Sequence, residues 1–208
     1  AHHCNFSDRS RNDRSHFDPP PLQTDLPQWW AKGPPYMDIP MSKVLIVCEH
    51  LDGKLNPSTA KCVSAAKALN PESIDIVVLA ADPARIAAEA AQIAGVSKVL
   101  TVANAANANA IAQVLAPQIA KAAAGYSHVF GPSTTFGKDL MPCVAALLGV
   151  SQISDIMAVD GAHTFKRPIY AGNAIVTVEA AADRVVVASV RTASWPEAAR
   201  GGGAAALA

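Results

Sequence analysis

The chain has 208 residues, of which half are hydrophobic and 16% are charged, with 17 basic side chains against 17 acidic ones. This composition suffices for the core of a folded domain and is not that of a disordered chain. A net charge of zero argues against nucleic acid or anionic lipid as the main partner, because phosphate binding needs an excess of Lys and Arg. No apolar run reaches the ~18–20 residues that cross a bilayer, so membrane insertion is not expected.

The first 40 residues differ from the rest. Seven of the 15 prolines lie there, at positions 19, 20, 21, 27, 34, 35 and 40, and stacked prolines prevent a helix or a central strand. The segment lacks the apolar region of a secretory signal, and its acidic residues are atypical of a mitochondrial transit peptide. We expect residues 1–40 to be a disordered leader that is not native, with the natural start at Met41. A genuine extension whose Trp29 and Trp30 dock on a partner is the alternative.

From Met41 onwards, short apolar runs typical of buried strands alternate with segments of helical periodicity. Strands are expected at 43–49, 74–79, 97–102 and 128–131, and helices at 56–69, 83–93, 106–123 and 136–148. Asn56 is a residue type that caps helices, and Pro57 fits the first helical position. The alternation predicts right-handed βαβ units and therefore a parallel sheet.

The pattern changes after Val150. Four β-rich runs follow without a long helix between them, at 154–159, 164–170, 173–179 and 184–190. The predicted fold is therefore an α/β Rossmann-like three-layer sandwich, with a parallel sheet core that ends in antiparallel C-terminal strands of one mixed sheet. Beyond Arg191 the chain thins to glycines and alanines, a composition typical of a linker.

The strongest candidate for a ligand-binding site is the segment of eight residues from Gly131 to Lys138 (GPSTTFGK), which joins a strand to a helix. The N–H groups of such a helix N-terminus can hold a phosphate, which makes Ser133, Thr134, Gly137 and Lys138 weak candidates for a phosphate site. Neither GxxxxGK(S/T) nor GxGxxG is present. The alternative is that a hydroxyl caps the helix and the glycines form a tight turn.

No catalytic constellation can be assembled from the remaining polar residues. His50, His128 and His163 have no Cys, Asp or Glu at metal-ligand spacing, and no GxSxG elbow is present. We therefore expect neither a catalytic residue nor a metal site, and we interpret His128 as a satisfied, half-buried histidine. The polar residues between His50 and Asn56 are expected to be loose surface groups.

The four cysteines, Cys4, Cys48, Cys62 and Cys143, lack CxxC or other metal-type spacing. We expect them to be small buried hydrophobes in a reducing cytoplasm.

Two charged residues stand at strand ends. Asp155, at a strand start, is expected to accept hydrogen bonds from loop N–H groups. Arg191, after the last strand, is expected to pair with an acidic group of a neighbouring domain.

Four blocks of sequence occur in the order found in one family. They are STTFGKDLMPCVAALL (133–148), SDI (154–156), IYAGNAIVTV (169–178) and SVRT (189–192). Together with the opening run VLIVCEH they resemble the α subunits of electron-transfer flavoproteins, from about Met41 to Gly203. Because four separated blocks agree in order, the resemblance is more specific than a single short motif.

The resemblance implies an adenine-nucleotide-α-hydrolase-like N-terminal domain at 41–192, with 193–208 as the start of a linker to a missing C-terminal FAD domain. It implies the scaffold and β-subunit interface of a heterodimeric electron carrier between dehydrogenases and downstream acceptors, which is not an enzyme. FAD is expected in the complete heterodimer and no cofactor is expected for this chain alone. The implied location is the cytoplasm, or the mitochondrial matrix in a eukaryote.

From the matching blocks we carry over only turn and interface roles, for Gly131, Phe136, Asp155, Tyr170, Gly172, Asn173 and Arg191. The alternative function is a stand-alone adenine-nucleotide-binding module of universal-stress-protein type, which would use the loop after Gly131. A hydrolase or ligase of the same superfold is the weakest interpretation, because no triad or phosphate loop is present.

Overall fold

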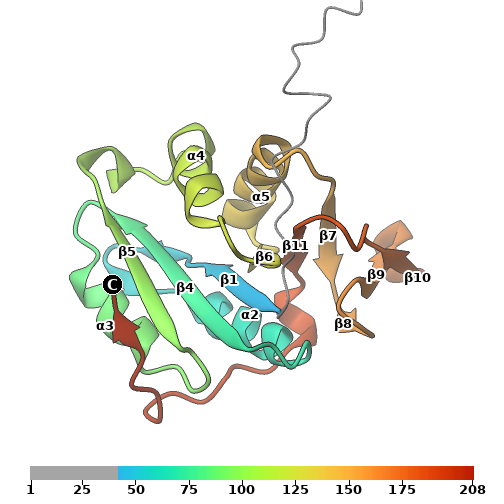
Figure 1. Ribbon diagram of the computed structural model, residues 1–208, viewed down its shortest axis with the longest axis horizontal. Coiled ribbons are helices and arrows are strands. Elements are labelled where there is room, and N and C mark those ends of the chain that lie inside the picture. Colours follow the sequence, from blue (N-terminus) through green and yellow to red (C-terminus); the bar gives the residue numbers. More distant parts are fainter. Residues whose placement is uncertain (1–41) are drawn as a thin grey trace, which may run out of the picture. The chain divides into compact units, whose positions relative to one another are not determined.

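The computed structural model describes residues 42–208, so the predictions for residues 1–40 and for Cys4 lie outside the described residues. A seven-stranded sheet forms the middle of this part (Figure 1), in the order β12-β5-β4-β1-β6-β11-β7. Every pair of neighbouring strands in it is parallel. The strands are β1 (Lys43–Val47), β4 (Ser73–Ala80), β5 (Lys98–Ala103), β6 (His128–Pro132), β7 (Gln152–Ile156), β11 (Val186–Val190) and β12 (Ala206–Leu207).

Helices cover both faces of this sheet (Figure 1), α2 (Pro57–Lys67) and α3 (Ala84–Ala91) on one face and α4 (Ala112–Ala122) and α5 (Thr135–Leu147) on the other. Successive side chains of a strand point to opposite faces. In β1, Val44 and Ile46 therefore join the α2/α3 core, whereas Leu45 and Val47 join the α4/α5 core. All four are fully buried. The predicted three-layer α/β sandwich is confirmed.

Local signals account for where α2 begins. At α2, the Asn56 side chain accepts a hydrogen bond from the N–H of Ser58 at 3.0 Å, with Pro57 in the first turn as predicted. The helix predicted at 106–123 is instead interrupted, with a short 3₁₀ turn, η1 (Ala105–Ala108), before α4. The reason is polar competition with the helix. Asn104 accepts from the N–H of Ala106, and the amides of buried Asn107 and Gln118 bond to each other.

The C-terminal strands include an antiparallel set, as predicted. The strands β8 (Ala158–Val159), β9 (Thr164–Ile169) and β10 (Ala174–Glu179) form a three-stranded antiparallel sheet in the order β10-β9-β8. This small sheet is separate, so the expectation of a single mixed sheet was wrong. The last predicted strand, β11, instead enters the parallel sheet between β6 and β7.

Burial explains this division of the C-terminal strands. All five residues of β11 are buried, as expected for an internal strand covered on both faces. Burial alternates along β10, which is typical of a strand with one solvent-facing side. Phe165 of β9 is fully buried in the α2/α3 core and thereby anchors the small sheet to the domain.

The segment 193–208, predicted to begin a linker, lies against the domain. Trp195 donates to the carbonyl of Ile156 at 3.4 Å, and Ala198 is buried. The final strand β12 pairs with β5 at the sheet edge (Figure 1). Its role as a linker stays a prediction.

Candidate functional site

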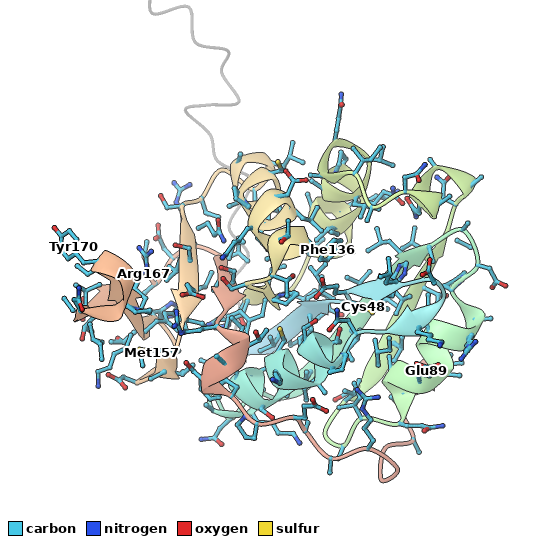
Figure 2. The ribbon with its side chains drawn as sticks, turned by 180° about the vertical axis from the view of Figure 1, so that it is seen from behind. Cys48, Glu89, Phe136, Met157, Arg167 and Tyr170 are labelled. Atoms are coloured by element: carbon cyan, nitrogen blue, oxygen red, sulfur yellow. The ribbon has the colours of Figure 1, made fainter. Side chains whose placement is uncertain are left out.

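The topology points to one place at the end of the sheet where the strands have their carboxyl termini. The chain runs from β1 to β4 and β5 on one side, and then crosses to β6 on the other side of β1. Ligands of open α/β sheets bind outside the carboxyl ends of the strands at such a switch point. Here it is flanked by Cys48 to His50 after β1 and by Ser133 and Thr134 after β6. Cys48 and Phe136, labelled in Figure 2, mark this end of the sheet.

The two glycines of the loop after β6 are explained by internal packing. A Cβ at Gly137 would collide with the carbonyl oxygen of Pro132, and a Cβ at Gly131 would collide with the sulfur of Met141. Neither glycine is therefore needed to admit a ligand. Phe136, in the first turn of α5, is half-buried against the α4/α5 core.

The hydroxyl groups of Ser133 and Thr134 in this loop differ in their hydrogen bonding. Thr134 is the N-cap of α5 and its Oγ1 accepts from the N–H of Gly137 at 3.4 Å. The N–H of Ser133 donates to the carbonyl of Val190 at 2.8 Å, but its buried Oγ has no hydrogen-bond partner among residues 42–208. Lys138 is exposed. Ser133, Thr134, Gly137 and Lys138 lie together, and their role as a phosphate site stays a prediction.

On the other side of the switch point, an acidic side chain lies at the start of α2. The Glu49 carboxylate accepts a hydrogen bond from Ser58 Oγ at 2.6 Å, in the first turn of α2. The N–H of Glu49 donates to Thr59 Oγ1 at 3.2 Å. A negative side chain is stabilised at a helix N-terminus, and it would repel a phosphate there. The first turn of α2 is therefore occupied by a side chain of the protein itself, and it does not favour a diphosphate there.

The loop between β1 and α2 is ordered. Asp52 and Lys54 are exposed, as expected of surface groups, but the expectation was wrong for His50, which is half-buried and hydrogen-bonded. It forms a hairpin of β2 (His50–Leu51) and β3 (Lys54–Leu55). Asp52 and Gly53 have φ of 50° and 70°, the left-handed values that a tight two-residue hairpin turn requires. The Nε2 of His50 lies 2.8 Å from the carbonyl oxygen of Leu79.

Asp155 and Arg191, 36 residues apart in sequence, form an ion pair of 2.6 Å between Oδ2 and Nη1. The partner of Arg191 is thus in its own domain and not in a neighbouring one. Asp155 also donates its N–H to Ser189 Oγ at 2.9 Å, and its φ of 60° is left-handed. The role of the Ser189 hydroxyl was missed, although the SVRT block that contains it was noted in the sequence.

The predicted interface residues Tyr170, Gly172 and Asn173 form the tip of the hairpin between β9 and β10. Tyr170, Ala171 and Gly172 have φ of 49°, 55° and 96°, which is an unfavourable conformation for the two residues with a Cβ. Tyr170 is 79% exposed, and Figure 2 shows it at the outer end of the hairpin. Ile175 is 57% exposed on the adjacent strand.

His128 is satisfied, as predicted, but it is fully rather than half buried. Its Nδ1 lies 2.8 Å from Ser127 Oγ and its Nε2 lies 2.7 Å from the carbonyl oxygen of Ala162. The ring stacks on His163 at a centroid distance of 6.1 Å. Burial lowers the pKa of His128, the bond to Ala162 opposes this, and the nearby His163 adds to it.

The cysteines divide by burial. Cys48 and Cys62 are buried, and burial raises the pKa of the Cys48 thiol to about 12. Cys143 is exposed on α5, so the expectation of burial was wrong for it. In the part of the chain that the structure describes, no group of three His, Cys, Asp or Glu side chains could hold a metal ion. Nor does any helix among those residues have the length and apolar character needed to cross a membrane.

The fold and its switch point define a Rossmann-like, doubly wound α/β domain. Residues 44–207 match the family model described as electron transfer flavoprotein domain. The chain therefore belongs to the electron transfer flavoprotein family, and it resembles the N-terminal domain of the α subunits.

Three relatives give the extent of the similarity. Electron transfer flavoprotein subunit alpha of Pseudomonas aeruginosa is 46% identical over 164 residues, which are 79% of this chain and 52% of the relative. The protein of the same name from Paracoccus denitrificans is 46% identical over 162 residues, 76% of this chain and 51% of the relative. The mitochondrial subunit alpha of Dictyostelium discoideum is 37% identical over 171 residues, 79% and 48% respectively. The chain thus spans about half the length of the curated relatives that it matches.

Proposed function

We propose that this chain is the scaffold part of an electron-transfer flavoprotein α subunit and that it docks a β subunit. The complete heterodimer would carry FAD and pass electrons from dehydrogenases to downstream acceptors. The names and the identity of the relatives support the α-subunit assignment. The single observation that supports docking is the exposed apolar tip of the β9–β10 hairpin.

The hairpin tip has the properties of an interaction surface. Tyr170 and Ile175 are large, exposed apolar side chains close together in sequence, and aromatic residues are enriched at protein interfaces. On the opposite face of β10, Ala174 and Val176 are only half-buried. A β subunit seated on this hairpin would remove apolar surface from water, which favours association.

The redox chemistry would belong to the flavin, which the protein positions and tunes. The carboxylate of Glu49 at the switch point disfavours a diphosphate there, so we propose that the FAD contacts of the heterodimer lie outside residues 42–208. No side chain of this chain is assigned a catalytic step. The proposed location is the cytoplasm, or the mitochondrial matrix if the source is eukaryotic.

The docking proposal can be tested with the chain and its cognate β subunit. We expect the two to co-elute in gel filtration, and we expect the variant Tyr170→Ser/Ile175→Ser to bind about tenfold more weakly or worse, because the apolar contact is lost. Leu147→Ser is the matched control, since Leu147 is 56% exposed on α5. Equal binding by the hairpin variant and the control would show that the hairpin is not the interface.

The alternative, a stand-alone adenine-nucleotide module, is favoured by one observation, the unpartnered buried hydroxyl of Ser133 at the switch point. Titration of the chain with ATP and with FAD distinguishes the two functions. Negligible binding of either nucleotide is expected from the scaffold proposal. Micromolar ATP binding that is lost in Ser133→Ala would instead support the nucleotide module.

A further inference from the structure

A cavity of about 380 Å³ lies between the small antiparallel sheet and the parallel sheet. Its walls come from the amino-terminal ends of β7 and β11 and from the end of β10, including Gln152, Val178 and Val186. The cavity therefore lies at the amino-terminal end of these parallel strands, and the switch point lies at their carboxyl end. The volume is in the range of sites for small molecules.

Two arginines line this cavity. Arg167 follows the fully buried Phe165 by two residues in β9, so both side chains point to the face of the small sheet that packs on the domain. In Figure 2, Arg167 lies between Tyr170 at the hairpin tip and the large sheet. Arg184 reaches the cavity from the loop before β11.

Both guanidinium groups have unused hydrogen-bonding capacity. The Nε of Arg167 is buried and has no partner among residues 42–208. Arg184 donates to the carbonyl oxygen of Gly149 at 3.4 Å, which is a long bond. Within the described residues, neither arginine forms an ion pair. A buried donor without an acceptor is unfavourable, and an acceptor supplied by a ligand would remove that penalty.

The rest of the lining limits the chemistry of the ligand. Glu179 is the single acidic residue among those that line the cavity, and it is exposed, so the two arginines leave an excess of positive charge. Ile153, Val178 and Val186 supply an apolar wall. The planar fork of a guanidinium group matches the oxygens of a carboxylate or a phosphate.

We propose that this cavity binds a small organic anion, whose carboxylate or phosphate group lies between Arg167 and Arg184 and whose apolar body contacts Ile153 and Val178. The ligand would connect β9 of the small sheet to the start of β11 in the parallel sheet. Binding would therefore hold the β9–β10 hairpin more firmly against the domain. This site does not depend on the identity of the docking partner.

The test uses the full 208-residue chain, with phenyl phosphate, phenylacetate and inorganic phosphate as probes and chloride at equal ionic strength as the reference. Isothermal titration and thermal unfolding are expected to detect phenyl phosphate or phenylacetate, and inorganic phosphate more weakly because it lacks an apolar body. The stronger of the two aromatic probes identifies the acidic group. Hydrogen exchange of β9 and β10 is expected to slow when the probe is bound.

Variants assign the binding to the cavity. Arg167→Gln and Arg184→Glu are each expected to weaken binding about tenfold or more, which corresponds to roughly 1.4 kcal/mol. Arg184 is exposed, so Arg184→Glu carries the test even if Arg167→Gln does not fold. Arg85→Gln is the matched control, because Arg85 is an exposed arginine paired with Glu89 on α3. The proposal is overturned if no probe binds beyond the chloride reference, or if Arg184→Glu binds as the control does.

Discussion

Gly137, in the first turn of α5, packs against the backbone of Pro132 at the end of β6. Alanine is favoured over glycine inside a helix by about 0.8–1 kcal/mol, so propensity alone predicts that Gly137→Ala stabilises the protein. The collision of the new Cβ with the carbonyl oxygen of Pro132 predicts the opposite sign, with a loss of about 1–3 kcal/mol in the free energy of unfolding. Urea unfolding measures it.

Gly161→Ala is the matched control for this substitution. Its Cβ would have no neighbour closer than 3.8 Å, and we expect a change within about 0.5 kcal/mol. A Gly137→Ala variant as stable as the natural chain would contradict the packing role assigned to this glycine.

His128 makes stability depend on pH in a direction that its burial fixes. Its pKa is lowered in the folded state, so the unfolded chain binds more protons in the window below its ordinary value of about 6.5. The contribution of His128 to stability is therefore full above that value and is lost as the pH falls through it towards the folded-state pKa. Denaturant unfolding between about pH 7.5 and pH 5.5 is expected to record the loss.

Substitution separates His128 from other titrating groups. His128→Gln is expected to be less stable at the upper pH, because it replaces a buried ring, but to depend less on pH. The control His50→Gln should leave the pH dependence of stability unchanged, because His50 is not among the groups that shift the pKa of His128. An unchanged pH dependence in His128→Gln would refute the assignment.

At the scale of elements, the pair of Asp155 and Arg191 connects β7 to the segment after β11. Its 2.6 Å distance and partial burial, with side-chain exposures of 26% and 41%, predict a coupling of roughly 0.5–1 kcal/mol. The measurement is a double-mutant cycle of Asp155→Asn and Arg191→Gln by urea unfolding. The reference is the pair of Lys43 and Glu72, which is 3.9 Å apart and more exposed, and for which additivity is expected. Additive effects of the two substitutions would show that the contact between Asp155 and Arg191 does not contribute to stability.

For the whole molecule, Phe165 decides whether the small sheet and the parallel sheet unfold together. It is fully buried, and its ring meets that of Phe130 in β6 at 6.3 Å and an interplanar angle of 78°. We expect residues 42–208 to unfold in one transition and Phe165→Ala to lower the free energy of unfolding by about 3–5 kcal/mol. Ile175→Ala, at an exposed position of the same sheet, should change it by less than about 0.5 kcal/mol.

Two probes check this prediction. Circular dichroism follows the whole domain, and the amide hydrogen exchange of β9 and β10 at each denaturant concentration follows the small sheet. Coincident transitions are expected. Separate transitions in the natural chain would show that the small sheet is an independent unit.

The sequence by itself determined most helices and strands of the parallel core, and the family, but not the β2–β3 hairpin or β12. These properties depend on local signals, such as the cap at Asn56, the buried run of β1 and the helical period of α5, and on four blocks that keep their order. The break before α4 was missed, because the side chains of Asn107 and Gln118 meet only after the chain has folded back.

The tertiary structure alone decided which distant residues meet. The place of β11 between β6 and β7, the pairing of Asp155 with Arg191, and the convergence of Arg167 and Arg184 on one cavity all join segments that are separated along the chain. The physical reason is that the pattern of apolar residues along a strand indicates which of its faces are buried. The pattern does not indicate which other strand lies beside it. That choice is made by burying the apolar faces of the whole domain at once.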